Sequence, residues 1–135
     1  MDKNLSFFFE LAKADTILAR RLSSHGMSFS EFMILYHLNQ APEQKLRRID
    51  LAEHLGLSAS GITRILLPME KIGLIERDLS ETDGRARYAK LTPAGKKFLD
   101  EAEQNIKNKI EDLIQPEESQ QIATLTKLLT AISGR

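Results

Sequence analysis

A tight break between two helical patterns constrains the fold of this 135-residue chain more than any other feature. Residues 47–55 have the apolar spacing of a short helix, and Gly56 follows, where helices commonly end in a left-handed residue. Ser58 is a good N-cap for a second helix that runs through Ile72, with Gly73 as its stop. Two helices joined by a few residues that include glycine predict a helix-turn-helix.

The apolar period changes from helical to strand-like after this second helix. Residues 74–79 and 87–91 have the length of strands, and the polar segment 80–86 between them contains an Asp-Gly turn. A β-hairpin directly after a helix-turn-helix is typical of a winged helix. The sequence therefore predicts a mainly α chain with a small β-hairpin wing.

Pro68 lies inside the second helix of the motif and cannot donate a hydrogen bond to the preceding turn. Either the helix is kinked there, or it ends near Leu67 and restarts. We favour the kink, because the apolar spacing continues in phase through Ile72.

Amphipathic helices are expected on both sides of this unit. Residues 2–24 carry one apolar stripe, residues 28–40 begin with a capping box, and Thr92 and Pro116 start two further helices. The terminal stripes lie too far from the middle of the chain for one copy to bury them all. We expect a second copy related by a two-fold axis, and an intramolecular helical hairpin is the alternative.

These patterns divide the chain into a central lobe and two terminal parts. We interpret residues 1–135 as a single unit in which residues 28–92 form the winged helix-turn-helix lobe. Residues 1–27 and 93–135 form the helical dimerisation region.

Composition excludes several classes of protein. With 41% hydrophobic residues and 19 basic against 19 acidic side chains, the chain is too apolar and too weakly charged to be disordered. It has no cysteine, which removes disulfides, thiolate metal sites and cysteine nucleophiles. It has no apolar run that could span a bilayer and no profile of a signal peptide, so we expect a soluble, cytoplasmic protein without a membrane partner.

Five motifs follow one another along the chain: residues 49–58 (IDLAEHLGLS), 63–66 (TRIL), 69–77 (MEKIGLIER), 83–87 (DGRAR) and 91–95 (LTPAG). In this order they resemble the MarR family of bacterial transcriptional regulators, and the resemblance covers essentially the whole chain. It implies a homodimer, held by its end helices, that binds pseudo-palindromic double-stranded DNA. It also implies repression of nearby genes and release of DNA by a small, frequently phenolic, effector.

The wing departs from the pattern of the family. A fuller wing reads Asp-x-Arg-Asp-x-Arg, which falls on residues 80–85. Ser80 and Thr82 replace the first Asp and Arg, and only Asp83 and Arg85 remain. We expect a wing that binds DNA less tightly or uses Arg87 instead.

Contacts to DNA are expected from the first two turns of the second motif helix, which must present small or polar side chains to a major groove. Thr63 can contact a base edge or a thymine methyl, Arg64 can bind guanine or a phosphate, and Ser58 is mainly a cap. In the wing, Arg85 can enter a minor groove or meet a phosphate. The predicted DNA-binding residues are Ser58, Ala59, Ser60, Gly61, Thr63, Arg64, Arg85, Arg87 and, at backbone phosphates, Arg47 and Arg48.

An effector pocket is expected where the first, second and fifth helices meet, although simple core packing explains the same residues. Tyr36 or His37 could orient a phenolic or anionic ligand there. The predicted lining residues are Phe8, Phe9, Met33, Tyr36, His37 and Phe98.

Catalytic and metal-binding patterns are missing from the sequence. It has no glycine-rich phosphate loop and no nucleophile with an identifiable base, so we expect neither an enzyme nor a cofactor. His25, His37 and His54 lie on different predicted elements without metal-ligand spacing. We interpret them as ordinary surface or core residues, and a metal site across a dimer interface is the remaining alternative.

The leading hypothesis is a sequence-specific DNA-binding transcriptional regulator, a repressor released by a small effector. The rival is a winged-helix protein-interaction module that binds no DNA, which the flat net charge and the shortened wing motif keep open. A small-molecule sensor that binds no DNA is a third interpretation.

Overall fold

Helix α2 (Phe29–Gln40) lies at the centre of the fold. A helix that is apolar on more than one face is stable only when several neighbours cover it. In this computed structural model, which describes residues 2–79 and 87–135, Ile34, Leu35 and Leu38 of α2 have no exposed surface. The predicted capping box is confirmed: the Ser28 hydroxyl accepts from the Glu31 N–H, and the Glu31 carboxylate accepts from the Ser28 N–H.

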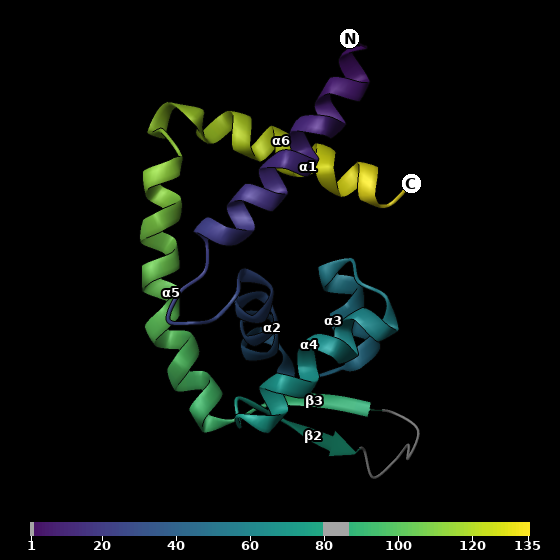
Figure 1. Cartoon of the computed structure of the whole chain (residues 1–135), viewed down its shortest axis with the longest axis vertical. Coiled ribbons are helices and arrows are strands. Elements are labelled where there is room, and N and C mark those ends of the chain that lie inside the picture. The colour runs from purple at the N-terminus through teal and green to yellow at the C-terminus, as the bar shows by residue number, and fades with distance from the viewer. Residues whose placement is uncertain (1, 80–86) are drawn as a thin grey trace.

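The other elements surround α2 or extend away from it (Figure 1). In chain order they are α1 (Lys3–Arg21), the 3₁₀ turn η1 (Pro42–Gln44), β1 (Lys45–Arg47), α3 (Arg48–Leu55), α4 (Ala59–Lys71), β2 (Ile75–Leu79), β3 (Arg87–Leu91), α5 (Pro93–Leu113), the 3₁₀ turn η2 (Pro116–Glu118) and α6 (Ser119–Ser133).

The helix-turn-helix is confirmed, and its turn has the expected geometry. Gly56 is left-handed with φ of 69°, and the Leu57 N–H donates to the Ala52 carbonyl at 2.8 Å. This hydrogen bond satisfies a carbonyl that the end of α3 would otherwise leave unpaired. Helix α4 continues through Pro68 without interruption, so the alternative of a helix that restarts after Leu67 is wrong.

The sheet has one strand more than the sequence predicted. Its three antiparallel strands lie in the order β1-β3-β2, with Leu46 of β1 opposite Ala89 of β3. Residue 47 closes β1 and caps α3, so this helix begins one residue later than expected. The turn of the wing, including Asp83 and Gly84, lies outside the described residues.

The end of α1 also differs from the sequence prediction, which extended it to residue 24. The helix ends at Arg21 because Ser24 and Met27 exchange backbone hydrogen bonds of 2.8 and 3.0 Å across a tight turn. The Ser24 hydroxyl, which is buried, bonds to the Asn105 side chain at 2.9 Å and fixes this turn against α5.

Helix α5 links the central lobe to the terminal helices (Figure 1). Its first half is buried against the core through Leu99, Ala102 and Ile106. The large apolar side chains that are exposed further along are Ile110 and Leu113, and neither α1 nor α6 buries a single residue. No helix of the described chain combines the length and the apolar character needed to cross a bilayer.

The junction between β2 and α5 depends on a close backbone approach. The Thr92 hydroxyl bonds to the carbonyls of Gly73 and Leu74 at 2.6 and 3.0 Å and accepts from the Gly95 N–H at 3.0 Å. A Cβ atom on Gly95 would lie 2.1 Å from the Leu74 carbonyl oxygen. Only glycine fits there without displacing the backbone.

We therefore expect Gly95→Ala to lower the free energy of unfolding by about 1–3 kcal/mol, the usual effect of overpacking, or by more. Urea unfolding measures the change. Gly134→Ala is the matched control, because its Cβ would meet its nearest atom at an ordinary 3.6 Å. Equal stability of the two variants would show that the junction is not tightly packed.

Candidate DNA-binding surface

Helix α4 separates an apolar inner face from an exposed outer face. Ile62, Leu66 and Met69 are buried in the core. The opposite side forms a shallow groove whose lining residues are Ala59, Ser60, Thr63, Arg64 and Leu67. Four of these five residues belong to the predicted DNA-binding set, so the structure brings that part of the prediction together on one surface.

The start of α4 is fixed by Ser58. Its hydroxyl accepts from the Gly61 N–H at 3.1 Å and lies 3.2 Å from the Ser60 hydroxyl. The prediction that Ser58 acts mainly as a cap agrees with these contacts. The helix N-terminus that it begins favours negative charge, such as a phosphate.

Arg48 was predicted to contact a backbone phosphate, and that role stays a prediction. The residue is only 9% exposed. Its Nη2 atom donates to the Thr63 hydroxyl at 3.3 Å, and that hydroxyl donates to the Ala59 carbonyl at 2.9 Å. Arg48, a residue of α3, therefore contacts Thr63 on the outer face of α4.

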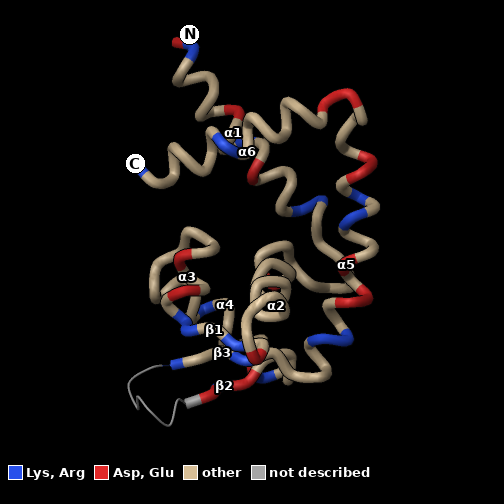
Figure 2. Tube along the Cα trace, turned by 180° about the vertical axis from the view of Figure 1, so that it is seen from behind, with Lys and Arg blue, Asp and Glu red and all other residues tan. Residues whose placement is uncertain are grey.

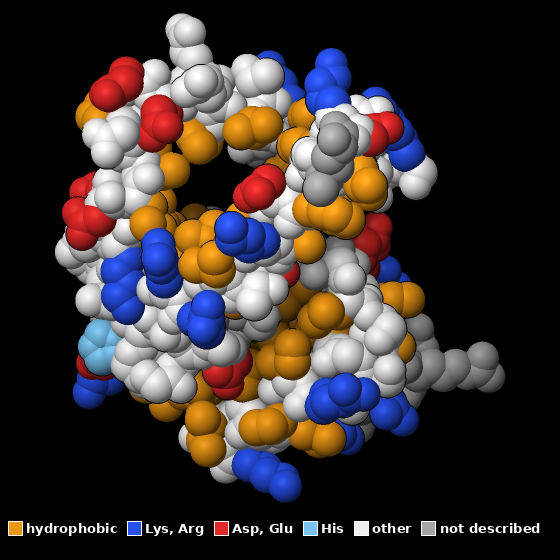
Figure 3. All heavy atoms as spheres, turned by 45° about the horizontal axis from the view of Figure 1, so that its top comes forward, with side chains coloured by type: hydrophobic (Ala, Val, Ile, Leu, Met, Phe, Trp, Pro, Cys, Tyr) orange, Lys and Arg blue, Asp and Glu red, His pale blue; other side chains and the backbone are white. Residues whose placement is uncertain are grey.

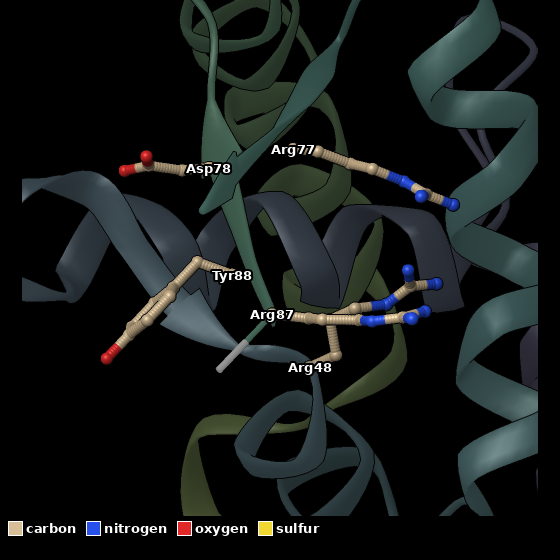
Figure 4. A pocket seen from close by; sticks show the side chains of 5 residues that line it. All are labelled: Arg48, Arg77, Asp78, Arg87 and Tyr88. Atoms are coloured by element: carbon tan, nitrogen blue, oxygen red, sulfur yellow. The ribbon is translucent and has the colours of Figure 1, made fainter. Parts of the chain in front are cut away.

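Three guanidinium groups meet around a pocket of about 240 Å³ beside Arg48. Figure 4 shows that the side chains of Arg48, Arg77 and Arg87 extend to the same side, whereas those of Asp78 and Tyr88 point the other way. Burial lowers the pKa of Arg48, Glu70 opposes this effect, and the charges of Arg77 and Arg87 add to it. Because arginine stays protonated in proteins, the pocket is positively charged.

The acidic side chains near this pocket already have partners. The Glu70 carboxylate binds Arg77 at 3.3 Å, and the Asp78 carboxylate binds Lys45 at 3.1 Å. Figure 2 shows the same concentration of basic residues where α3, α4 and the sheet meet. This charge is local, because the net charge of the whole chain is zero.

The other predicted arginines have different surroundings. Arg64 and Arg87 are exposed. Arg47 is also exposed and forms two hydrogen bonds with the Asp50 carboxylate, at 3.0 and 3.2 Å. Arg85 lies outside the described residues, so its role stays a prediction from the sequence.

The six residues of the predicted effector pocket differ in burial and in the residues that they contact. Tyr36 and His37 are in edge contact, with ring centroids 6.4 Å apart, and Phe98 packs on the core. Phe8 and Phe9 are about half exposed on α1, and Met33 is half-buried on α2. The convergence of all six stays a prediction.

Sequence analysis missed a contact between two histidines. His37 of α2 and His54 of α3 stack with centroids 4.5 Å apart and rings inclined by 12°. Their separation in sequence gives no indication of this pair, because it arises from the packing of the two helices. In the described part of the chain, no group of three or more histidine, cysteine or acidic side chains could hold a metal ion.

A helix-turn-helix with an exposed outer helix face and a three-stranded sheet defines a winged-helix protein. Residues 27–86 match the model of the MarR family. The chain is 29% identical over 113 residues to the transcriptional repressor MprA of Escherichia coli; the match covers 82% of this chain and 64% of the length of that repressor.

Solved structures of low sequence identity share the fold. Sco3205 of Streptomyces coelicolor, a MarR family regulator solved in complex with DNA, has a TM-score of 0.82 and 21% identity, with 93% of this chain and 84% of that chain covered. NadR in complex with 4-hydroxyphenylacetate has a TM-score of 0.73 and 21% identity, with 98% and 93% covered. The central part of the chain is thus similar to the MarR family, and these structures share the fold of the whole chain.

The histidine pair predicts a dependence of stability on pH. Burial, and next the neighbouring His54, lower the pKa of His37 from its ordinary value of 6.5. Below this value the unfolded chain binds more protons than the folded one, so the free energy of unfolding falls as pH decreases from 6.5. Well above pH 6.5, His37 is neutral in both the folded and the unfolded chain, so its contribution to the free energy of unfolding no longer changes with pH.

Urea unfolding at pH 7.5 and 5.5 measures the effect. His37→Gln should lose less stability than the wild type between these two values, and His25→Gln, which leaves the stacked pair intact, is the matched control. Identical pH dependence in His37→Gln and the wild type would contradict the assignment.

Proposed function

We propose that this chain is a sequence-specific DNA-binding transcriptional regulator that acts as a repressor on pseudo-palindromic duplex DNA in the cytoplasm, and that it has no catalytic role. The observation that carries the proposal is the outer face of α4. There, small side chains and exposed Arg64 lie at a helix N-terminus beside a cluster of buried and exposed arginines.

Physical chemistry matches this surface to DNA. The major groove admits one α-helix, and small residues such as Ala59 and Gly61 let the helix backbone approach the base edges. Arginine can form two hydrogen bonds with guanine, which suits Arg64. Two similar proteins support the same function, because MprA is a transcriptional repressor and Sco3205 was solved in complex with DNA.

The terminal helices support a homodimer. Apolar side chains that one copy leaves exposed are Leu5, Phe8, Phe9 and Leu11 of α1, Ile110 and Leu113 of α5, and Ile122, Leu125 and Leu128 of α6. Figure 3 shows apolar atoms around the opening between these helices and the lobe. A second copy would cover them and place two α4 helices in successive major grooves, roughly 34 Å apart.

A small aromatic molecule is the proposed effector. NadR, which shares this fold, was solved with 4-hydroxyphenylacetate, a phenolic acid. Tyr36 and His37, in edge contact with each other, offer polar groups that could orient such a ligand. Binding between the terminal helices and the lobe would change the separation of the two α4 helices and release DNA.

The proposed function is tested by selecting bound duplexes from a random pool. The affinity for the selected site is then measured. Arg64→Ala should weaken binding by about 1–3 kcal/mol and relax the preference at one base pair of each half-site. Lys71→Ala, which removes a charge from the far end of the same helix, should keep that preference. Failure to select any sequence would contradict the proposal and favour a protein-interaction module.

Sedimentation tests the proposed dimer. Leu125→Asp places a charge in the exposed apolar stripe of α6 and should yield a monomer with much weaker binding to the selected duplex. Gln120→Asp adds the same charge roughly 140° away around the helix and should stay dimeric. A wild-type monomer, or a dimeric Leu125→Asp variant, would contradict this interface.

A further inference from the structure

We infer that Thr63 recognises thymine through its side-chain methyl group, and that Arg48 is the positioning residue that makes the methyl, rather than the hydroxyl, the group offered to DNA. This inference rests on the proposed DNA-binding function. It decides between the two contacts that the sequence left open for Thr63, a base edge or a thymine methyl.

The hydroxyl of Thr63 is already engaged within the protein. A threonine hydroxyl has one proton to donate and two lone pairs to accept. The proton goes to the Ala59 carbonyl at 2.9 Å, and one lone pair accepts from Arg48 at 3.3 Å. Thr63 therefore has no proton left for the acceptor atoms that bases present in the major groove.

The same two bonds fix the orientation of the side chain. The Ala59 carbonyl belongs to the preceding turn of α4, and Arg48 approaches from the buried side of the helix. Because both partners hold the oxygen inward, the methyl is the part of Thr63 that faces the groove it shares with Ala59 and Leu67. These neighbours present further apolar surface there.

Arg48 donates to Thr63, and the nearby Glu70 carboxylate, whose charge acts on Arg48, binds Arg77 at 3.3 Å. Across the pocket Arg48 faces Arg77 and Arg87, which have no acceptor atoms (Figure 4). Asp78 and Tyr88 point away, and the Asp78 carboxylate binds Lys45 at 3.1 Å. Arg48 is only 9% exposed as a residue, so losing a partner for its donor costs free energy, which favours the bond to Thr63.

The base that suits a methyl group in the major groove is thymine. Its C5-methyl is the only apolar group on any base edge there, and an apolar side chain distinguishes it by contact. Deoxyuridine lacks this methyl and is otherwise identical, which makes it a direct probe of the contact.

The experiment replaces each thymine of the selected duplex in turn by deoxyuridine and measures affinity. Wild-type protein should lose about fourfold at one thymine of each half-site, the effect of burying one methyl group. Thr63→Ser keeps the hydroxyl but not the methyl, so it should bind the thymine and deoxyuridine duplexes equally at that position. If the sensitive thymine instead contacted Ala59, its preference over deoxyuridine would persist in Thr63→Ser.

Arg48 is tested on the same pair of duplexes. Arg48→Met fills the pocket without a donor and should reduce the thymine preference, taken as the ratio of the affinities for the thymine and deoxyuridine duplexes, in which a general loss of charge cancels. Arg48→Lys keeps a donor and should restore part of the preference. Urea unfolding establishes that each variant is folded, and the Thr63→Ser result stands by itself if Arg48→Met does not fold.

The outcomes separate this inference from the function on which it rests. If no duplex is selected, the proposed function fails. If a duplex is selected but no thymine is sensitive to deoxyuridine, or the sensitivity persists in Thr63→Ser, the inference about the methyl is wrong and DNA binding stands. Full thymine preference in a folded Arg48→Met variant would overturn the positioning role alone.

Discussion

The burial of one face of α4 is the constraint on which the rest of the structure depends. Ile62, Leu66 and Met69 fix the rotation of this helix against the core, so the side chains between them must face outward. The geometry of the whole surface follows, because a small rotation of α4 would expose apolar atoms and bury Arg64. A helix whose rotation is set by the core can present the same residues to a ligand every time.

The neighbouring elements hold this helix at both ends and from behind. Left-handed glycines close α3 and α4, at Gly56 and Gly73, and each is followed by a backbone hydrogen bond back into its helix, of 2.8 and 3.0 Å. Behind the outer face, Arg48 joins the start of α3 to the middle of α4. The surface is thus shaped by residues that do not themselves reach it.

The sequence predicts best what is decided locally. The caps at Ser28 and Ser58 and the turn at Gly56 depend on residues within one helical turn, and all three are as expected. The short strand β1, the burial of Arg48 and the stacking of His37 on His54 depend instead on segments that meet only in the folded chain. No local pattern contains that information, and family resemblance did not supply it either.

The central claim is that the outer face of α4 is the DNA-binding surface. Its most direct test is to map the changes in backbone amide chemical shifts when a selected duplex is added. The account predicts the largest changes at residues 58–64, with further changes at the start of α3 and in β3, and small changes along α6. Changes concentrated on α1 and α6, with α4 unaffected, would contradict it.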